Sequence, residues 1–169
     1  MGQVKDLHNA EAIAKLQDIV AHNRSCLLHS GGILDTQDSR PMTVQEVCDQ
    51  GNFWMFSGRS SAKNAQIKVE PRVLLTMANT DRSEYLVVHG EATEVDDQAR
   101  KERLWNSFLG AWFSGGVTDP ELTLIKVSPI DCKYWDTTDG KLYSLLKIAG
   151  AAMTGKMNDS GSVVGKIEV

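Results

Sequence analysis

The sequence has few of the residues that build disulfide frameworks or metal centres. Its 169 residues include three cysteines, Cys26, Cys48 and Cys132, and four histidines. The cysteines are far apart and lack CxxC spacing, which argues against disulfides and against a zinc site. No HxxxH pair occurs either. We therefore expect no metal centre, and we interpret the cysteines as reduced, mostly buried residues.

Long apolar runs and basic runs are also missing. No apolar stretch approaches the roughly 20 residues of a membrane span, and residues 1–16 are too polar for a signal peptide. The formal net charge is −4, and the lysines and arginines are scattered, whereas a nucleic-acid-binding protein shows a basic face. We expect a cytoplasmic protein that binds neither membranes nor nucleic acids.

Signatures of common enzyme classes are absent as well. The chain has no GxSxG elbow, no Walker phosphate loop and no dinucleotide fingerprint. The acidic pair Asp96 and Asp97 is sufficiently explained as a helix N-cap. Sequence patterns of this kind therefore leave the catalytic residues unknown.

Short apolar segments make up the first half of the chain. Apolar residues at three- and four-residue spacing predict a helix over 9–21. Strands are expected over 25–30, 51–57, 72–79 and 84–95; the third should be buried on both faces, and Gly90 should mark a bulge or a close approach. Two extended pieces around a polar turn are expected within 33–47, and Pro41 should lie at a sheet edge or start a strand.

The second half predicts further helices and strands. Asp96 or Asp97 should cap a helix that has one apolar face. We interpret this face as core or interface, with stacking on a ligand as the alternative. The residues on that face are Leu104, Trp105, Phe108, Leu109 and Trp112. Two strands around Ser128-Pro129, a helix over 140–153 and a strand within 158–169 follow. Because strands mostly follow strands, we expect one mainly β domain (α+β), a small antiparallel barrel with flanking helices.

One polar stretch suggests anion binding. "SGRSSAK", residues 57–63, follows an aromatic strand and precedes a short helix expected over 63–68. Backbone N–H groups and the helix dipole favour an anion at such a junction, and hydroxyls and a lysine add hydrogen bonds and charge. The same residues also suit an ordinary helix cap, so this stretch alone leaves both interpretations open.

Several motifs in a fixed order resemble a known family. The segments are "SRPM", "FSGRSSAK", "VVHGEATEVDD", "LWNSFLGAWFSGGVTDPELTLIKV" and "KYWD". Together they resemble the FMN-binding split-barrel superfamily, which contains pyridoxamine 5′-phosphate oxidase, and within it the bacterial general stress proteins. The resemblance covers nearly the whole chain. It implies a single split-barrel domain over 1–169, in which residues 155–169 are a candidate flexible tail.

The resemblance implies a flavin-holding strand at "RPMTVQ". Arg40 matches a phosphate-binding arginine, and Pro41, Met42 and Thr43 continue the strand along the flavin. A backbone N–H near Thr43 could donate to the flavin ring. Gln45 stands where the oxidase has a lysine that touches its substrate, which argues against oxidation of pyridoxamine phosphate.

Further cofactor contacts follow from the other motifs. Phe56 and Ser57 match an aromatic–threonine pair that contacts the flavin. Ser61 and Lys63 match residues that hold its phosphate, and Trp135 matches a tryptophan presented by the neighbouring subunit. The resemblance thus implies a homodimer with the cofactor at the subunit interface.

Two departures from the oxidase limit what the resemblance implies. The arginine between the matched serine and lysine is replaced by Ala62, and Arg59 or Ser60 is expected to compensate. The residues after Trp135, "DTTDGKLYS", lack the arginines and histidine with which the oxidase binds its substrate.

The function implied is flavin binding without the oxidase reaction. FMN is the expected cofactor, and FAD shares its flavin and first phosphate. The chain has no separate nicotinamide-binding motif, which favours a flavin-binding general stress protein. A flavin reductase or oxidoreductase with an unknown small substrate is the alternative, and deazaflavin or haem is less favoured. His89 is interpreted as a sheet histidine, with a place near the flavin as the alternative.

Overall fold

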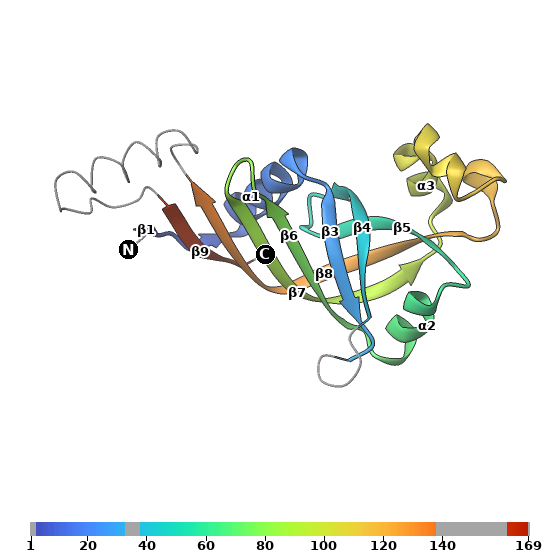
Figure 1. Ribbon diagram of the computed structural model, residues 1–169, viewed down its shortest axis with the longest axis horizontal. Coiled ribbons are helices and arrows are strands. Elements are labelled where there is room, and N and C mark those ends of the chain that lie inside the picture. The colour runs from blue at the N-terminus through green and yellow to red at the C-terminus, as the bar shows by residue number, and fades with distance from the viewer. Residues whose placement is uncertain (1–2, 33–37, 138–161, 169) are drawn as a thin grey trace.

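Six strands form a closed antiparallel barrel (Figure 1). The computed structural model describes residues 3–32, 38–137 and 162–168. Around the barrel the strand order is β8-β5-β4-β3-β6-β7, and pairing of β7 with β8 closes it. The strands are β3 (Ser25–Ser30), β4 (Asp38–Val47), β5 (Phe53–Gly58), β6 (Arg72–Asn79), β7 (Glu84–Val95) and β8 (Leu122–Thr137). The expected antiparallel barrel is confirmed.

The remaining elements flank this barrel. They are β1 (Gln3–Val4), β2 (Leu7–His8), α1 (Asn9–His22), α2 (Ala62–Val69), α3 (Gln98–Leu104), two 3₁₀ helices, η1 (Ser107–Ala111) and η2 (Gly116–Thr118), and β9 (Ser162–Glu168). The expected terminal strand is present as β9, which pairs with the end of β8 and with β1 and β2. Sequence reasoning missed β1 and β2. The helix expected over 140–153 lies outside the described residues.

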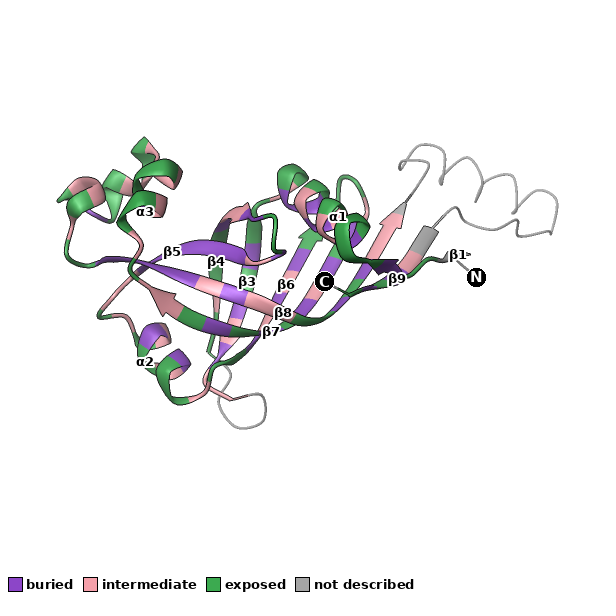
Figure 2. Ribbon diagram, turned by 180° about the vertical axis from the view of Figure 1, so that it is seen from behind, coloured by how far each residue is buried: buried purple, intermediate pink, exposed green. Residues whose placement is uncertain are grey.

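The core fills the barrel interior and the groove under α1. The helix expected over 9–21 is confirmed, and its apolar face is buried; the buried residues of α1 are Ala12, Leu16, Ile19 and Val20. They join one cluster with barrel residues such as Phe53, Met55 and Leu75, all fully buried. Figure 2 shows this burial along β5 and β8. Each such side chain contributes roughly 1.5–3 kcal/mol by leaving water.

Strand β6 does not have the expected burial. Its buried residues alternate, with Val73, Leu75 and Met77 inside and Leu74 and Thr76 partly exposed. The expectation of burial on both faces is wrong, because one face of β6 lines the barrel interior and the other lies on the barrel surface.

The pairing of β7 with β8 changes register at Gly90. The pairing shifts between His89 and Gly90, and a Cβ atom at Gly90 would lie 2.6 Å from the carbonyl oxygen of Ser128. The close approach predicted at Gly90 is confirmed, and the register shift lies opposite it, with Ile130 of β8 as the extra residue. The two strands expected around Ser128-Pro129 are in fact one, because this irregularity accommodates the proline within a continuous β8.

The barrel is split between β4 and β5. Their pairing covers only Val44 to Val47 of β4, whereas the pairing of β4 with β3 continues back to Asp38. Pro41 thus pairs with Leu27 on one side and lies at a locally open edge on the other, as its missing N–H predicts. Of the segment 33–47, in which two extended pieces were expected, residues 38–47 form one strand, β4, and residues 33–37 lie outside the described residues.

The aromatic segment after β7 is not one helix. Asp97 caps α3, accepting a hydrogen bond from the backbone N of Arg100 at 2.9 Å, but α3 ends at Leu104 and η1 begins at Ser107. Phe108 and Trp112 are 82% and 75% exposed. The expected single helix is therefore wrong, and these two residues lie outside the core of the chain.

Candidate functional site

A cavity of about 690 Å³ lies where β4 and β5 separate. This volume is within the usual range for a small-molecule site. Strands β4 and β5, helix α2 and the segment around η1 all contribute to its wall. The lining residues are Arg24, Pro41, Met42, Thr43, Gln45, Phe56, Ser57, Gly58, Lys63, Asn106, Phe108, Leu109, Trp112 and Phe113.

One end of the cavity is a cluster of hydroxyl groups at the start of α2. Ser57 Oγ donates to Oδ1 of Asn64 at 2.6 Å, and Ser61 Oγ donates to the same atom at 3.1 Å. Lys63 Nζ donates to Ser61 Oγ at 3.1 Å. Asn64 is fully buried and orients both serines, a role that sequence reasoning missed although Asn64 follows Lys63 directly.

Arg40 lies beside this cluster with a free donor. Its Nη2 donates to Oε1 of Gln66 at 3.0 Å and lies 3.3 Å from Oδ2 of Asp38. Its Nη1 is buried and has no hydrogen-bond partner among the described residues. A buried donor without an acceptor costs free energy, and the described residues supply no acceptor for this atom.

Lys63 is the cation next to Arg40, and unlike Arg40, which pairs with Asp38, it has no acidic partner among the described residues. Among residues 3–32, 38–137 and 162–168 it forms no ion pair. Burial, followed by the positive charge of Arg40, lowers the pKa of Lys63. Two neighbouring cations raise each other's free energy, and an anion between them removes that cost.

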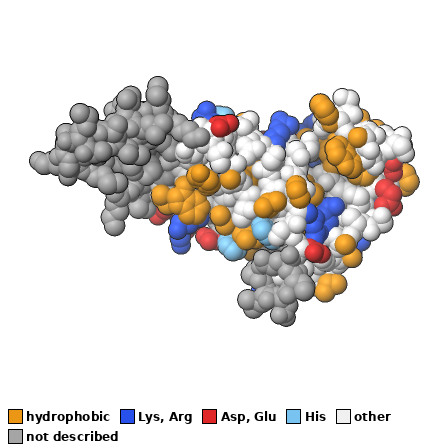
Figure 3. Space-filling model, in the orientation of Figure 1, with side chains coloured by type: hydrophobic (Ala, Val, Ile, Leu, Met, Phe, Trp, Pro, Cys, Tyr) orange, Lys and Arg blue, Asp and Glu red, His pale blue; other side chains and the backbone are white. Residues whose placement is uncertain are grey.

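The opposite wall of the cavity is aromatic. Phe56 is buried and meets Trp105 edge-on, with ring centroids 6.3 Å apart and planes at 80°. Phe108 and Trp112 leave large exposed surfaces beside it, and Figure 3 shows hydrophobic side chains over this region near α3. The structure places Phe108 and Trp112 on the wall of the cavity rather than in the core, which agrees with ligand stacking, the alternative interpretation, and the expectation of an interface stays a prediction.

The open edge of β4 supplies polar backbone groups. The backbone N of Val44 donates to the carbonyl of Arg24 at 2.9 Å. Because bonding directions alternate along an antiparallel strand, the peptide groups of Thr43 face away from β3. The carbonyl of Thr43 accepts from Nε2 of Gln45 at 3.4 Å, and Asn106 donates to Oε1 of Gln45 at 3.3 Å.

The expected compensation for the missing arginine does not occur. Arg59 binds Asp96 at 2.7 Å and Glu94 at 3.4 Å. Ser60 donates to Glu121 through both its backbone N and its Oγ, at 3.0 and 2.6 Å. Both side chains are held by these carboxylates, and among the described residues neither forms a hydrogen bond with Lys63.

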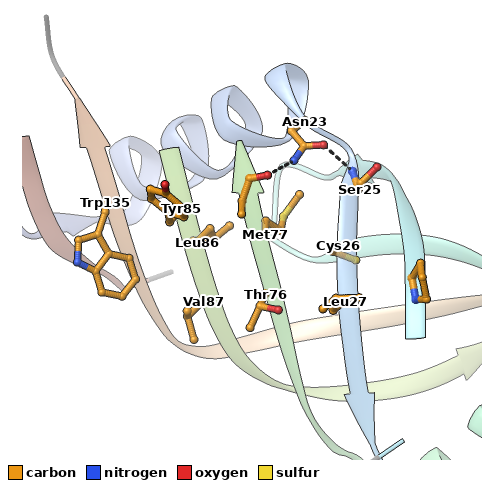
Figure 4. A pocket seen from close by; sticks show the side chains of 12 residues that line it. Asn23, Ser25, Cys26, Leu27, Thr76, Met77, Tyr85, Leu86, Val87 and Trp135 are labelled. Carbon is orange, nitrogen blue, oxygen red and sulfur yellow. Dashed lines mark hydrogen bonds between the residues drawn. The ribbon is translucent and has the colours of Figure 1, made fainter. Parts of the chain in front are cut away.

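Trp135 lies apart from this cavity within the same chain. It lines an apolar groove of about 680 Å³ over β3, β6, β7 and β8, together with Tyr85, Val87 and Leu27 (Figure 4). Pro41 lines both the groove and the cavity. His89 is exposed on β7 and lines neither.

One cluster of potential metal ligands was not foreseen. Ligand atoms of Asp18, His22 and Glu84 lie within 4.8 Å of one another. Arg82 already pairs with Glu84 at 3.1 Å, so the buried carboxylate has a cationic partner. No described helix has the length and apolar character to span a membrane.

A match over most of its length places the chain in a known family. Residues 11–159 match the family described as pyridoxamine 5′-phosphate oxidase like. The chain therefore belongs to the pyridoxamine 5′-phosphate oxidase like family, and its barrel is the FMN-binding split-barrel fold.

Relatives with solved structures include general stress proteins. A putative general stress protein 26 from Jannaschia sp. CCS1 has 24% identity and a TM-score of 0.72, with 90% of this chain and 93% of that chain covered. The general stress FMN/FAD binding protein of Xanthomonas citri has 27% identity and a TM-score of 0.65, covering 77% and 91%.

A curated relative is longer. Protein bli-3 of Neurospora crassa is 25% identical over 127 residues, which are 70% of this chain. The match spans 61% of the length of that relative.

Proposed function

We propose that the cavity between β4 and β5 binds FMN, and that the protein is a flavin-binding general stress protein. The observation that carries this proposal is Lys63 at one end of an aromatic-walled cavity, with Arg40 as its neighbouring cation. Arg40 has a buried, unpartnered Nη1, and Lys63 has no acidic partner among the described residues. A phosphate would accept hydrogen bonds from both. The FMN/FAD-binding description of the Xanthomonas citri protein agrees with this assignment.

The residues present fit a flavin with a phosphate at the α2 end. Lys63, Ser61, Ser57 and Arg40 would hold the phosphate through charge-assisted hydrogen bonds. FAD carries the same first phosphate, so the cluster would accept it as well.

The flavin ring would lie against the apolar part of the cavity. Phe56 and Trp112 offer aromatic surface, and Pro41, Met42 and Thr43 form the open edge of β4. A backbone N–H of this edge would donate to a ring acceptor. When bound, a flavin supplies electron and hydride transfer, while the protein supplies binding and orientation.

The lining favours binding over dedicated catalysis. Its ionisable side chains are Arg24 and Lys63, and the described residues that line it include no histidine, aspartate, glutamate or cysteine. Gln45 and Asn106, at the far side, are neutral. A flavin reductase is the second candidate, because the exposed Phe108 and Trp112 leave one side of the cavity open to an electron donor.

We also propose that two chains associate through the apolar groove. Tyr85 and Leu27 are 41% and 44% exposed at this groove, and burial of such surface favours association. The groove reaches the cavity at Pro41, so a partner chain seated there would bring its own residues, Trp135 among them, toward the flavin. Sedimentation of the protein against Tyr85→Asp tests this: a dimer that dissociates in the variant is expected, and a monomer in both overturns it.

Visible spectroscopy tests the flavin assignment. The purified protein is expected to retain FMN through desalting, with absorption bands that weaken in Arg40→Ala and Lys63→Ala. Addition of NADH or NADPH without oxygen then separates the two candidates. Unchanged bands indicate a binding protein, and rapid bleaching indicates a reductase. Failure to retain FMN or FAD at micromolar concentration would overturn the proposal.

A further inference from the structure

A serine and a histidine meet on the outer face of the barrel, outside the flavin cavity. Ser39 on β4 pairs directly with His29 on β3, and Ser39 Oγ lies 2.6 Å from Nδ1 of His29. Neither residue lines the flavin cavity or the apolar groove. The pairing of the two strands, rather than a sequence motif, brings these side chains together.

The register of the two strands explains this short contact. The backbone N of Val44 donates to the carbonyl of Arg24, and the pairing of β3 with β4 continues without a shift as far as Asp38. Hydrogen-bonded and non-hydrogen-bonded pairs alternate along an antiparallel ladder, so Ser39 and His29 form a non-hydrogen-bonded pair. Side chains of such pairs lie closest to one another.

A third residue orients the imidazole. Thr76 on β6 lies diagonally across from His29, because Leu27 pairs with Thr76 and His29 pairs with Leu74. Thr76 Oγ1 lies 3.3 Å from Nε2 of His29. A neutral imidazole has one donor and one acceptor nitrogen. The 2.6 Å contact suits a hydroxyl donor and is shorter than the usual range of N–H donors. Nδ1 is therefore the acceptor for Ser39, and Nε2 donates to Thr76.

This arrangement is that of an activated nucleophile. A hydroxyl within hydrogen-bonding distance of a base, with the base oriented by a further group, is the geometry that a serine nucleophile requires. Ser39 is exposed, so a substrate can reach its Oγ. Its peptide N–H faces away from β3, toward an edge of β4 with which no described strand pairs before Val44. This N–H is available to the oxyanion that develops during attack on a carbonyl group.

The partner of Ser39 distinguishes it from other serines of the chain. Ser30 donates to the carboxamide of Gln66 at 2.8 Å, and Ser61 donates to that of Asn64 at 3.1 Å. A carboxamide does not take up a proton near neutral pH, whereas a neutral imidazole does. Ser39 is thus the hydroxyl with a general base beside it.

We propose that Ser39 and His29 form a nucleophilic pair that takes the acyl group of a small activated ester. Ser39 Oγ attacks the carbonyl carbon, and its proton passes to Nδ1 of His29. The bond between the carbonyl carbon and the alcohol oxygen then breaks, and the alcohol leaves with that proton. The acyl group stays on Ser39 as an ester until water hydrolyses it. No flavin takes part, so this activity is independent of the proposed flavin binding.

The test is acetylation by 4-nitrophenyl acetate. Release of 4-nitrophenolate is followed by absorption, and the acetylated residue is located by peptide mass spectrometry. We expect a rapid burst of 4-nitrophenolate equal to the amount of protein chain, with the acetyl group on Ser39. Ser39→Ala should lose both, whereas Ser107→Ala, at another exposed serine, should react like the native protein. Acetylation confined to lysines and other histidines, or an equal burst in Ser39→Ala, would overturn the proposal.

Variants of the two supporting residues test the roles within the pair. His29→Gln removes the base and should slow acetylation of Ser39 roughly a hundredfold, while His8→Gln, at an exposed histidine that contacts Glu168, should not. Thr76→Val removes the orienting hydroxyl and should slow the reaction roughly tenfold, and Thr76→Ser should restore the rate. Equal rates in the native protein and His29→Gln would contradict the role of His29. Because Ser39→Ala changes an exposed residue, the main test does not depend on how the other variants fold.

Discussion

Replacement of Lys63 by glutamine separates recognition of the phosphate from recognition of the flavin ring. In the structure Nζ of Lys63 donates to Ser61 at 3.1 Å at the edge of the cavity, with Arg40 as its charged neighbour. A charge-assisted hydrogen bond contributes roughly 1.5–3 kcal/mol, and each 1.4 kcal/mol changes an affinity about tenfold. We therefore expect Lys63→Gln to weaken FMN binding by roughly ten- to a hundredfold.

The assay is a flavin fluorescence titration with FMN and with riboflavin. Riboflavin has the same ring and no phosphate, so its affinity should be unchanged in Lys63→Gln. Lys68→Gln is the matched control on the same helix, because Lys68 is 62% exposed and pairs with Glu94 at 2.9 Å. An equal loss for FMN and riboflavin, or no loss for FMN, would refute the reasoning.

The pH dependence follows from the same lysine. The pKa of Lys63 is lowered in the free protein, so its charge is lost as the pH rises through that value. FMN affinity should decrease over the same alkaline range, with proton uptake on binding, and Lys63→Gln should abolish this dependence. A pH-independent affinity in the native protein would contradict the assignment.

Three other predictions concern stability and the aromatic wall. Gly90→Ala should lower the free energy of unfolding in urea by roughly 1–3 kcal/mol, since its Cβ meets Ser128, while Gly110→Ala, with open space around it, should not. Burial alone would raise the pKa of Glu94, but hydrogen bonds and positive charge from its partners, above all Lys68, outweigh burial and lower it. The free energy of unfolding should therefore decrease as the pH falls below about 4.5. This decrease should be less steep in Glu94→Gln. Trp112→Ala should weaken FMN and riboflavin equally, and an effect confined to FMN would exclude ring contact.

The barrel could be predicted because its strands alternate and follow one another. Strand β5 and the single helix α1 have strong local patterns, and Gly90 is located where the backbones of β7 and β8 approach. The continuity of β8 through Pro129 could not be predicted, since it depends on a register shift that the partner strand permits. The burial of β6 was misjudged because apolar residues on a barrel surface look the same in sequence as buried ones.

The order of the sequence motifs predicted the polar half of the candidate site, and it did not predict the aromatic half. Ser57, Ser61 and Lys63 meet at the start of α2 as the resemblance implies. The break between Leu104 and Ser107 turns Phe108 and Trp112 toward the cavity, and no spacing in the sequence announces that break. The buried role of Asn64 also depends on tertiary contacts, because it needs both serines in place.

A crystal structure of the protein grown with FMN tests most directly whether the flavin binds in the cavity between β4 and β5. We predict the phosphate within hydrogen-bonding distance of Lys63 Nζ and Arg40 Nη1, with the ring beside Phe56 and the open edge of β4. Flavin bound elsewhere, or a phosphate directed away from both cations, would contradict the central claim.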